Sequence, residues 1–365
     1  MLRRAAHLAP DELKLKLSMT ASFGATKPTV RLPFFHRAMS LELTLEHLRL
    51  SLPPPAAGEF LALERLALKG CRFDTAALLR RCPRLRVLDV GPEAELAMDA
   101  SQTIHLPFLQ ELVVEESVHR TRFHIVAPML EHLSLVTTIE HASVLVPNLK
   151  KITLDCSRDV RKIELGNMEQ LQELTLSGLY RLAFRDFLRI GHGVAAFMRR
   201  LPRLRLLRIN MSMVPRLLEH DDCLEELPMT SILILELSTY GHVFVTTVLQ
   251  LLQKVKSIEE LNVILEDSPK AKNVLCIQEC SCHHDRNRRI DGFSLSFFRK
   301  IKFKGFNGTH SAVSVLEELM SYAKTLEQMI VRLCNEVSTS KESHKHQLLN
   351  IFDSYHWVKC QVLDA

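Results

Sequence analysis

One pattern recurs along this chain: an apolar residue, two variable positions, a second apolar residue, one variable position and a third apolar residue. It stands out in "RCPRLRVLDV" (81–90) and again in "RLPRLRLLRIN" (200–210). A single copy carries little information, because ordinary helices and strands also show this spacing. The pattern begins, however, at Leu45, Leu63, Leu85, Leu109, Leu130, Leu149, Leu171, Leu204, Ile232, Ile258, Phe298 and Leu326. Twelve copies in one chain predict a repeat architecture.

The spacing of the copies predicts strands. From Leu45 to Leu171 the starts follow one another at about 18 to 24 residues, and the later steps widen to about 26 to 40 residues. In the tight copies the pattern stops too soon for an amphipathic helix of two or three turns, so each copy predicts a short strand whose leucines point into a continuous core. Five copies carry proline two residues ahead of the first position, at Pro83, Pro107, Pro128, Pro147 and Pro202. Proline fixes φ and donates no ladder hydrogen bond, which suits the entry to a strand.

Helices are expected between some of the strands, because the later steps are wide enough to hold them. The candidates are residues 74–82 with Asp74 as N-cap, 184–201, 242–255, and 309–326 with Thr309 or Ser311 as N-cap. Their apolar residues recur at three and four positions, as an outer layer packed on strands requires. Near the start, "LKLKLSM" is typical of a strand.

The repeats resemble the leucine-rich-repeat family. The family's Asn or Cys three residues after the last leucine is clear only at Cys71. The resemblance therefore implies an α/β fold, an irregular leucine-rich-repeat solenoid (horseshoe) with variable outer helices and turns.

Residues 295–333 resemble the FBD module of plant F-box/leucine-rich-repeat proteins. They read as a strand "RKIKFKGF", an "NG" turn, a helix "VSVLEELMSYAKTL" and a strand "EQMIVRL". The segments "LRRAAHLAPDELKLKL", "GEFLALERLALKGCRFD" and "CPRLRVLDV" are similar to the grass branch of that family. We therefore expect a leucine-rich-repeat region over 1–266, a Cys- and basic-rich loop over 267–294, an FBD-like β-α-β cap over 295–338 and a C-terminal tail over 339–365.

The resemblance implies a protein-binding module, similar to the substrate-recognition part of an SCF-type E3 ubiquitin ligase receptor. The family's F-box, which docks on the Skp1 adaptor, has no counterpart here, so Skp1 is an expected partner only if an F-box is supplied. Two alternatives stay open. The first is an F-box-less scaffold or decoy adaptor with no ligase role. The second is a small-ligand-sensing receptor, which would need a deep pocket and phosphate-binding basic residues on the concave face.

Composition narrows the class of function. The 47 basic and 42 acidic residues give a formal charge of +5, a mildly basic mixture that argues against nucleic acid as the partner. No apolar run approaches the roughly 18 residues that span a bilayer and the start lacks a secretory apolar region, so we expect a cytoplasmic or nuclear protein with no membrane partner. Walker A, HExxH, GxSxG and strand-linked GxGxxG motifs are missing, so we expect neither an enzyme nor a cofactor.

Three clusters offer chemistry that we weigh against plainer interpretations. Cys276, Cys280, Cys282, His283 and His284 could hold zinc, but they lack paired CxxC spacing, and reduced loop cysteines are the favoured interpretation. The carboxylates of 220–227 fit a solvated loop better than an acid/base pair. The basic runs 286–289 and 299–304 could bind phosphate or direct nuclear import, although a solvated loop and an ordinary strand face are favoured.

The candidate binding residues follow from strand geometry. If the leucines point inward, period two places the intervening side chains on the exposed, concave face. These are His47, Arg49, Arg65, Lys69, Asp89, Glu111, Glu115, His132, Lys151, Asp155, Glu173, Arg208, Glu236 and Glu260. The set is basic at its N-terminal end and mainly acidic from the middle on, which predicts a target protein with a complementary order of charge.

Overall fold

The computed structural model describes residues 6, 8–18, 29–54, 58–72, 75–92, 103–115, 121–155, 163–166, 168–180, 201, 204–212, 227–238, 245–254, 257–266, 295–334 and 338–364. The described residues form two compact units, one up to Leu171 (unit 1) and one from Gln172 onward (unit 2). Both consist mainly of parallel strands with some helix, so the predicted α/β class is confirmed.

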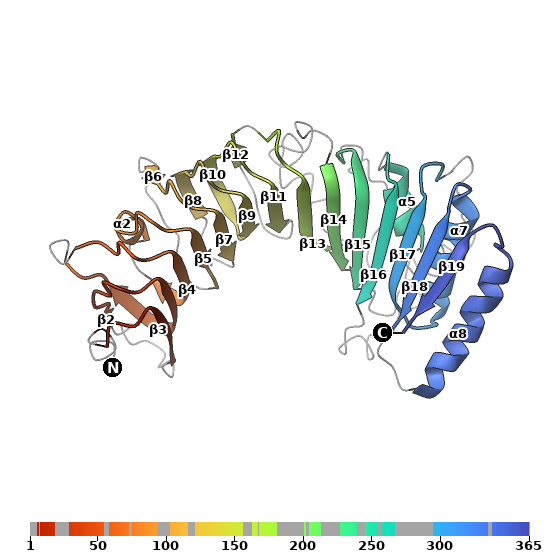
Figure 1. The fold of residues 1–365 in the computed structure, drawn as a ribbon, viewed down its shortest axis with the longest axis horizontal. Coiled ribbons are helices and arrows are strands. Elements are labelled where there is room, and N and C mark those ends of the chain that lie inside the picture. Colours follow the sequence, from red (N-terminus) through yellow and green to blue (C-terminus); the bar gives the residue numbers. More distant parts are fainter. Residues whose placement is uncertain are drawn as a thin grey trace. The chain divides into compact units, whose positions relative to one another are not determined.

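Unit 1 contains a main sheet in which every pairing that joins its strands is parallel (Figure 1). Its strands, in spatial order, are β1 (Glu12–Ser18), β3 (Ser40–Ser51), β4 (Arg65–Arg72), β5 (Val87–Val90), β7 (Glu111–Glu115), β9 (His132–Val136) and β11 (Lys151–Asp155). The short β2 (Thr29–Arg31) pairs with the end of β3, and helix α2 (Thr75–Leu79) lies between β4 and β5 in the chain. The strands of the main sheet thus follow one another in the same order in the sheet as in the chain, as a repeat predicts.

Unit 1 also contains a second sheet, whose strands alternate along the chain with strands of the main sheet. It consists of β6 (Thr103–His105), β8 (Thr121–Val126), β10 (Ile139–Leu145) and β12 (Ile163–Leu165), again all parallel. Phe123, Ile125, Ala142 and Val144 of this sheet are buried. The outer layer that we expected to be helices and turns is therefore a sheet over this part of unit 1.

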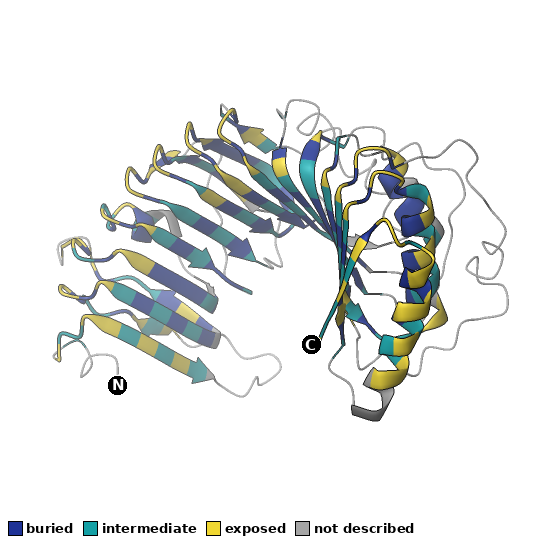
Figure 2. Cartoon of the chain, turned by 45° about the vertical axis from the view of Figure 1, so that its right-hand side comes forward, coloured by how far each residue is buried: buried dark blue, intermediate teal, exposed yellow. Residues whose placement is uncertain are grey.

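Unit 2 contains one parallel sheet with helices in its crossovers (Figure 1). The strands are β13 (Glu173–Tyr180), β14 (Leu204–Ser212), β15 (Thr230–Ser238), β16 (Glu260–Glu266), β17 (Lys300–Phe306), β18 (Gln328–Leu333) and β19 (Lys359–Leu363). The helices are α5 (Val245–Lys254), α7 (His310–Tyr322) and α8 (Ser338–Asp353). Figure 2 shows the helices on one side of the last strands.

The core is built from the leucines of the repeat. Along β7, Leu112 and Val114 are fully buried, whereas Glu111, Val113 and Glu115 between them are half-buried. The same alternation runs through several other strands, including β5 and β9 (Figure 2). Period two therefore divides each strand into an inward apolar side and an outward, mostly polar side.

A tight turn leads into each of several strands and explains the prolines. The N–H of Leu85 donates to the carbonyl of Cys82 at 3.2 Å, and that of Leu109 donates to Leu106 at 3.2 Å. Pro83 and Pro107 thus stand second in a four-residue turn, the position for which proline's φ is suited. Proline stabilises the turn that leads into the strand.

Backbone hydrogen bonds at the entries link each strand to the next. The carbonyl of Glu64 accepts N–H groups from both Arg86 and Val87, at 2.8 and 2.9 Å. The carbonyl of Arg299 accepts from Glu327 and Gln328 in the same way, at 2.9 and 3.0 Å. This shared geometry fixes which residues of successive copies are equivalent.

The equivalence corrects the phase of two predicted copies. Ser40 pairs with Arg65, so Ala38 rather than Leu45 corresponds to Leu63. Thr230 pairs with Leu204, so Thr230 rather than Ile232 begins the copy of β15. Both strands are long and carry leucines at alternate positions, so the spacing of the pattern fits at more than one position along the strand.

The helix predictions have mixed outcomes. Residues 242–255 and 309–326 contain α5 and α7, and Thr309 caps α7 as predicted, its hydroxyl accepting the N–H of Ala312 at 3.4 Å. Residues 74–82 form only the short α2, while 184–201 and Asp74 lie outside the described residues. The segment 339–365, expected to be a tail, contains most of α8 and all of β19, which pairs with β18. Residues 267–294 are outside the described part of the chain.

Candidate binding faces

The outward residues of unit 1 form rows across the strands, and we call this surface face 1. The register aligns Arg65, Val87, Glu111, His132 and Lys151 in one row. All five side chains are exposed or half-buried. A sheet surface with a row of this kind can contact a protein surface through several side chains at once.

Lys69 and Asp89 are neighbours on face 1. The ammonium of Lys69 lies 3.8 Å from the carboxylate of Asp89. A Cβ added to Gly91 would lie 2.6 Å from Cγ of Lys69, so the absent side chain at Gly91 leaves room for the lysine stem. Oδ1 of Asp89 is buried and accepts no hydrogen bond from the described residues. These two predicted binding residues thus partly neutralise each other.

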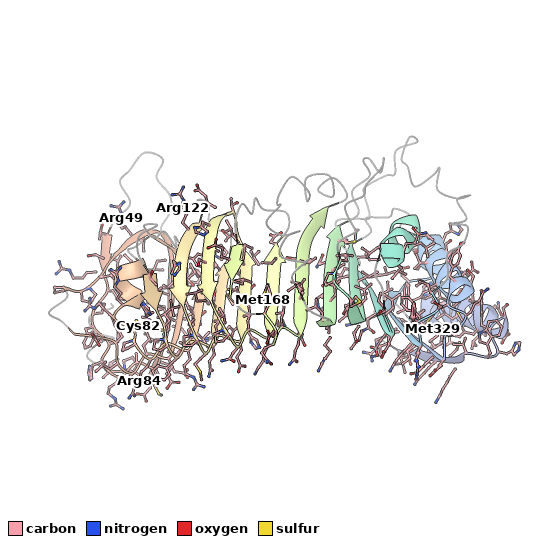
Figure 3. The ribbon with its side chains drawn as sticks, turned by 90° about the horizontal axis from the view of Figure 1, so that it is seen from above. Arg49, Cys82, Arg84, Arg122, Met168 and Met329 are labelled. Carbon is pink, nitrogen blue, oxygen red and sulfur yellow. The ribbon has the colours of Figure 1, made fainter. Side chains whose placement is uncertain are left out.

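The other predicted residues of unit 1 lie in different settings. Glu115 is half-buried at the end of β7, and Asp155 at the end of β11 is 9% exposed and already has an interaction partner. Arg49 follows an irregularity in β3 and pairs by register with Thr29, so it lies beyond the rows of face 1. Figure 3 shows Arg49 at the same edge of the unit as Arg122, opposite the edge where Arg84 lies. The side chain of His47 is outside the described set.

In unit 2, the outward residues of β13–β16 carry paired charges. Arg208 on β14 donates to Glu236 on β15, and Asn210 donates to the other oxygen of Glu236 at 3.3 Å. Glu173 stands in the same cross-strand row as Glu260, through Leu206 and Ile232. The negative charge predicted on these strands is therefore largely paired with neighbouring side chains of the same unit.

Glu260 on β16 has two side-chain partners, one of them charged. Lys302 on β17 donates to its carboxylate at 2.6 Å, and Asn262 donates at 3.1 Å. Partial burial alone would raise the pKa of Glu260, but these hydrogen bonds and the charges of Lys302 and Lys300 hold that pKa below its ordinary value. Glu260 is accordingly a carboxylate at neutral pH.

Beyond β16, the charge on this side of the sheet changes sign. The outward residues of β17–β19 include Lys300, Lys302, Lys304, Arg332 and Lys359. The expectation of an acidic surface from the middle onward fails here, because the sequence reading of the face stopped at Glu260. The alternation of basic and apolar residues in "RKIKFK" was a sequence signal for the positive charge on β17. The pairing of β18 and β19 with β17 adds Arg332 and Lys359 to the same surface.

A cavity of about 340 Å³ lies where β16, β17 and β18 begin. It is lined by Ser257, Glu259, Ser296, Phe297, Arg299, Thr325 and Glu327. Arg299 is 4.0 Å from the carboxylate of Glu327. With two carboxylates beside one cation, the lining is a poor match for the phosphate-binding site that a ligand-sensing receptor would need.

The other residues considered for metal binding or catalysis form no such site in the described part of the chain. Cys276, Cys280, Cys282 and His283, like the carboxylates of 220–227, lie outside the described residues. Within the described residues, no group of His, Cys, Asp and Glu side chains is arranged to hold a metal ion. Cys82 is buried, which raises the pKa of its thiol to about 12 and makes it a poor nucleophile.

Comparison with known proteins identifies no family for this chain. It matches no protein-family model, no curated protein and no solved structure. Among the helices that the structure describes, none combines the length and apolar character needed to cross a bilayer.

Proposed function

We propose that this chain is a protein-binding leucine-rich-repeat solenoid that recognises a target protein through the outward faces of its parallel strands. We further propose that it is the substrate-recognition part of an SCF-type ubiquitin ligase receptor, which would bind the Skp1 adaptor through an F-box. The observation that carries the proposal is the cross-strand row of Arg65, Glu111, His132 and Lys151 on face 1.

Two features of face 1 support recognition of a protein rather than a small molecule. Its outward residues include the half-buried Val87, Val113 and Val136 among the charged side chains. A mixture of apolar and charged groups spread over several strands is typical of protein interfaces, whereas small ligands are held in pockets.

Site-specific crosslinking tests target binding. A photoreactive amino acid at Val113, on face 1, should capture a defined protein in the source cells, whereas the same group at His124, on the outer surface of the second sheet, should not. Equal capture of that protein at both positions, or capture at neither, would contradict the proposal.

Charge reversal tests the specificity of the same contact. E111K with E115K should weaken binding of the captured protein at least tenfold, because opposite charges across an interface steer and register the complex. E59K with E64K makes the same change of charge at exposed positions before β4 and should leave binding unchanged.

The ligase part of the proposal has a separate test. The 5′ end of the natural transcript is sequenced, and the encoded protein is tested for co-purification with Skp1. An in-frame F-box with bound Skp1 is the expected result. A protein that binds its target without Skp1 would instead be a scaffold or decoy adaptor.

A further inference from the structure

The last three strands of unit 2 present a surface of one sign, which we call the basic face. Its nine outward positions are Lys300, Lys302, Lys304, Gln328, Ile330, Arg332, Lys359, Gln361 and Leu363. Five of the nine are cations and none is a carboxylate. The inward positions, such as Ile301, Phe303, Met329 and Val331, are buried. The charge is thus confined to one side of the sheet.

The register sets the spacing of these charges. Lys300, Gln328 and Lys359 form one row, and Lys304 stands beside Arg332 two outward positions further along the strands. Adjacent strands are about 4.8 Å apart and outward residues about 6.7 Å apart along a strand, so the cations occupy a patch of roughly 10 by 13 Å. Lys304, Arg332 and Lys359 are exposed.

Most of this charge has no partner within the described residues. Lys302 donates to Glu260 at 2.6 Å, and Lys300 stands opposite Glu260 in the register and helps to lower its pKa. Lys304, Arg332 and Lys359 have no carboxylate within ion-pair distance among the described residues. Nearby carboxylates are engaged elsewhere: Asp364 lies 3.1 Å from Lys345, and Glu266 accepts from Ser238. Like charges on adjacent strands, such as Lys304 and Arg332, repel each other. The folded protein therefore carries an electrostatic cost that an anionic partner would relieve.

The neighbouring strands show that this arrangement is particular to β17–β19. On β14 and β15, the cation Arg208 is matched by Glu236. On β16, Glu260 is matched by Lys302. A merely solvated sheet face would be expected to continue this pairing of signs across the last strands.

We propose that the basic face is a docking surface for an acidic segment of a partner protein. The inference deepens the proposed binding function by naming the chemistry of a partner, and it rests on that function. An extended peptide with a carboxylate at every second residue repeats at about 6.7 Å, so its carboxylates can reach the exposed Lys304, Arg332 and Lys359, which are not opposite Glu260 in the register. Ile330 and Leu363 give the same peptide apolar contacts between its charges.

Nucleic acid fits the basic face less well. None of its nine outward residues is aromatic, so bases would have no ring on which to stack. A phosphate backbone running across the sheet would also meet Glu260 and Glu266 on the neighbouring strand β16. A peptide, in contrast, can end its run of carboxylates at the edge of the patch.

The test uses the full chain and a fluorescent peptide of eight residues with alternating Glu and Ser. Binding is measured by anisotropy at about 50 mM and about 500 mM NaCl, since salt screens exposed charges. The triple variant K304Q/R332Q/K359Q should bind the peptide roughly tenfold more weakly, because each exposed contact contributes a factor of about two. A peptide with Gln in place of Glu should not bind.

The matched control is K16Q/R84Q/K324Q, which removes three exposed cations away from the basic face. It should bind the peptide like the unaltered chain. Equal losses in both triple variants, no binding of the peptide, or tighter binding of an eight-residue oligothymidine would each overturn the inference.

The two proposals can fail independently. If the Val113 crosslink forms but the acidic peptide does not bind, the basic face has been assigned wrongly and target recognition by face 1 stands. If the peptide binds with the expected variant pattern but Val113 captures no protein, recognition through face 1 is overturned and the basic face remains a docking surface.

Discussion

The two units build their outer layers differently on the same kind of inner sheet. In unit 1, the steps from Leu85 to Leu149 are about 19 to 24 residues long, and the outer segments are strands β6, β8 and β10. In unit 2, the steps that begin at Thr230 and at Phe298 are each about 28 residues long, and the outer segments are α5 and α7. A helix advances about 1.5 Å per residue and a strand about 3.3 Å, so an extended segment covers an inner strand with fewer residues. The step from Leu63 to Leu85, of about 22 residues, nevertheless contains the short helix α2, so the length of a step does not by itself select the outer layer.

The largest expected effects come from removing one buried side chain of each outer layer. I125A truncates a fully buried residue of β8, and L316A does the same in α7. Each should lower the free energy of unfolding by about 3 kcal/mol, through lost burial and the cavity left behind. Urea unfolding gives the size of the loss, and hydrogen exchange gives its location. An effect below about 1 kcal/mol at Ile125 would show that the second sheet is not part of the core of unit 1.

Replacing one glycine of each unit by alanine tests how closely other atoms approach the backbone at that position. Gly305 in β17 has φ +82°, and an added Cβ would lie 2.4 Å from the carbonyl oxygen of Leu265. Gly58 in unit 1 has φ +106°, but its nearest neighbour would be the Phe34 ring at 3.4 Å. G305A should therefore destabilise by about 2–3 kcal/mol, and G58A by about 1 kcal/mol, which is the conformational term alone. Thermal melts of the two variants measure the difference, and equal losses would contradict the close approach at Gly305.

The N-cap of α7 should contribute a smaller amount. T309A removes the hydroxyl that accepts the Ala312 N–H and should cost about 1 kcal/mol, while T309S retains an acceptor and should cost much less. Chemical denaturation compares the three proteins. Equal destabilisation by both substitutions would indicate lost side-chain packing instead of lost capping.

The smallest expected effect concerns the ion pair between β16 and β17. The folded pKa of Glu260 is lowered, so its pairing stabilises the fold above the unfolded pKa and is lost as pH falls through the folded pKa. K302Q should destabilise unit 2 by less than about 1 kcal/mol at pH 7, because both side chains are partly exposed. Urea titrations at pH 7 and pH 3 should show that the difference from the unaltered chain shrinks in acid. A difference that grows in acid would refute this assignment.

Sequence patterns located most of the inner strands because their signal is local. The register moves only two of the twelve predicted copies, those at Leu45 and Ile232, and both lie in long strands with apolar residues at every second position. β19 escaped notice because its inward residues are Cys360 and Val362, a weak apolar signal after the exposed Trp357. The second sheet of unit 1 was missed since its strands have no repeated letter pattern, and β6 and β12 are in addition only three residues long.

The candidate binding faces were likewise predicted only in part from the sequence. Alternation along one strand was enough to predict which side chains of β4, β7 and β9 point outward. Which charges meet was not predictable, because Arg208 and Glu236, or Lys302 and Glu260, are 28 and 42 residues apart in the chain. Those pairings removed part of the expected acidic surface, and the register of β17–β19 assembled a basic one.

The sequence by itself determined the strands, their inward leucines, the turns that precede them and the capping of α7, since each depends on neighbours within a few residues. The tertiary structure alone decided the phase between strands, the choice of strand or helix for the outer layer, and the charge of each face. Those properties depend on hydrogen bonds and contacts between residues that are tens of positions apart, and no local pattern records such partners.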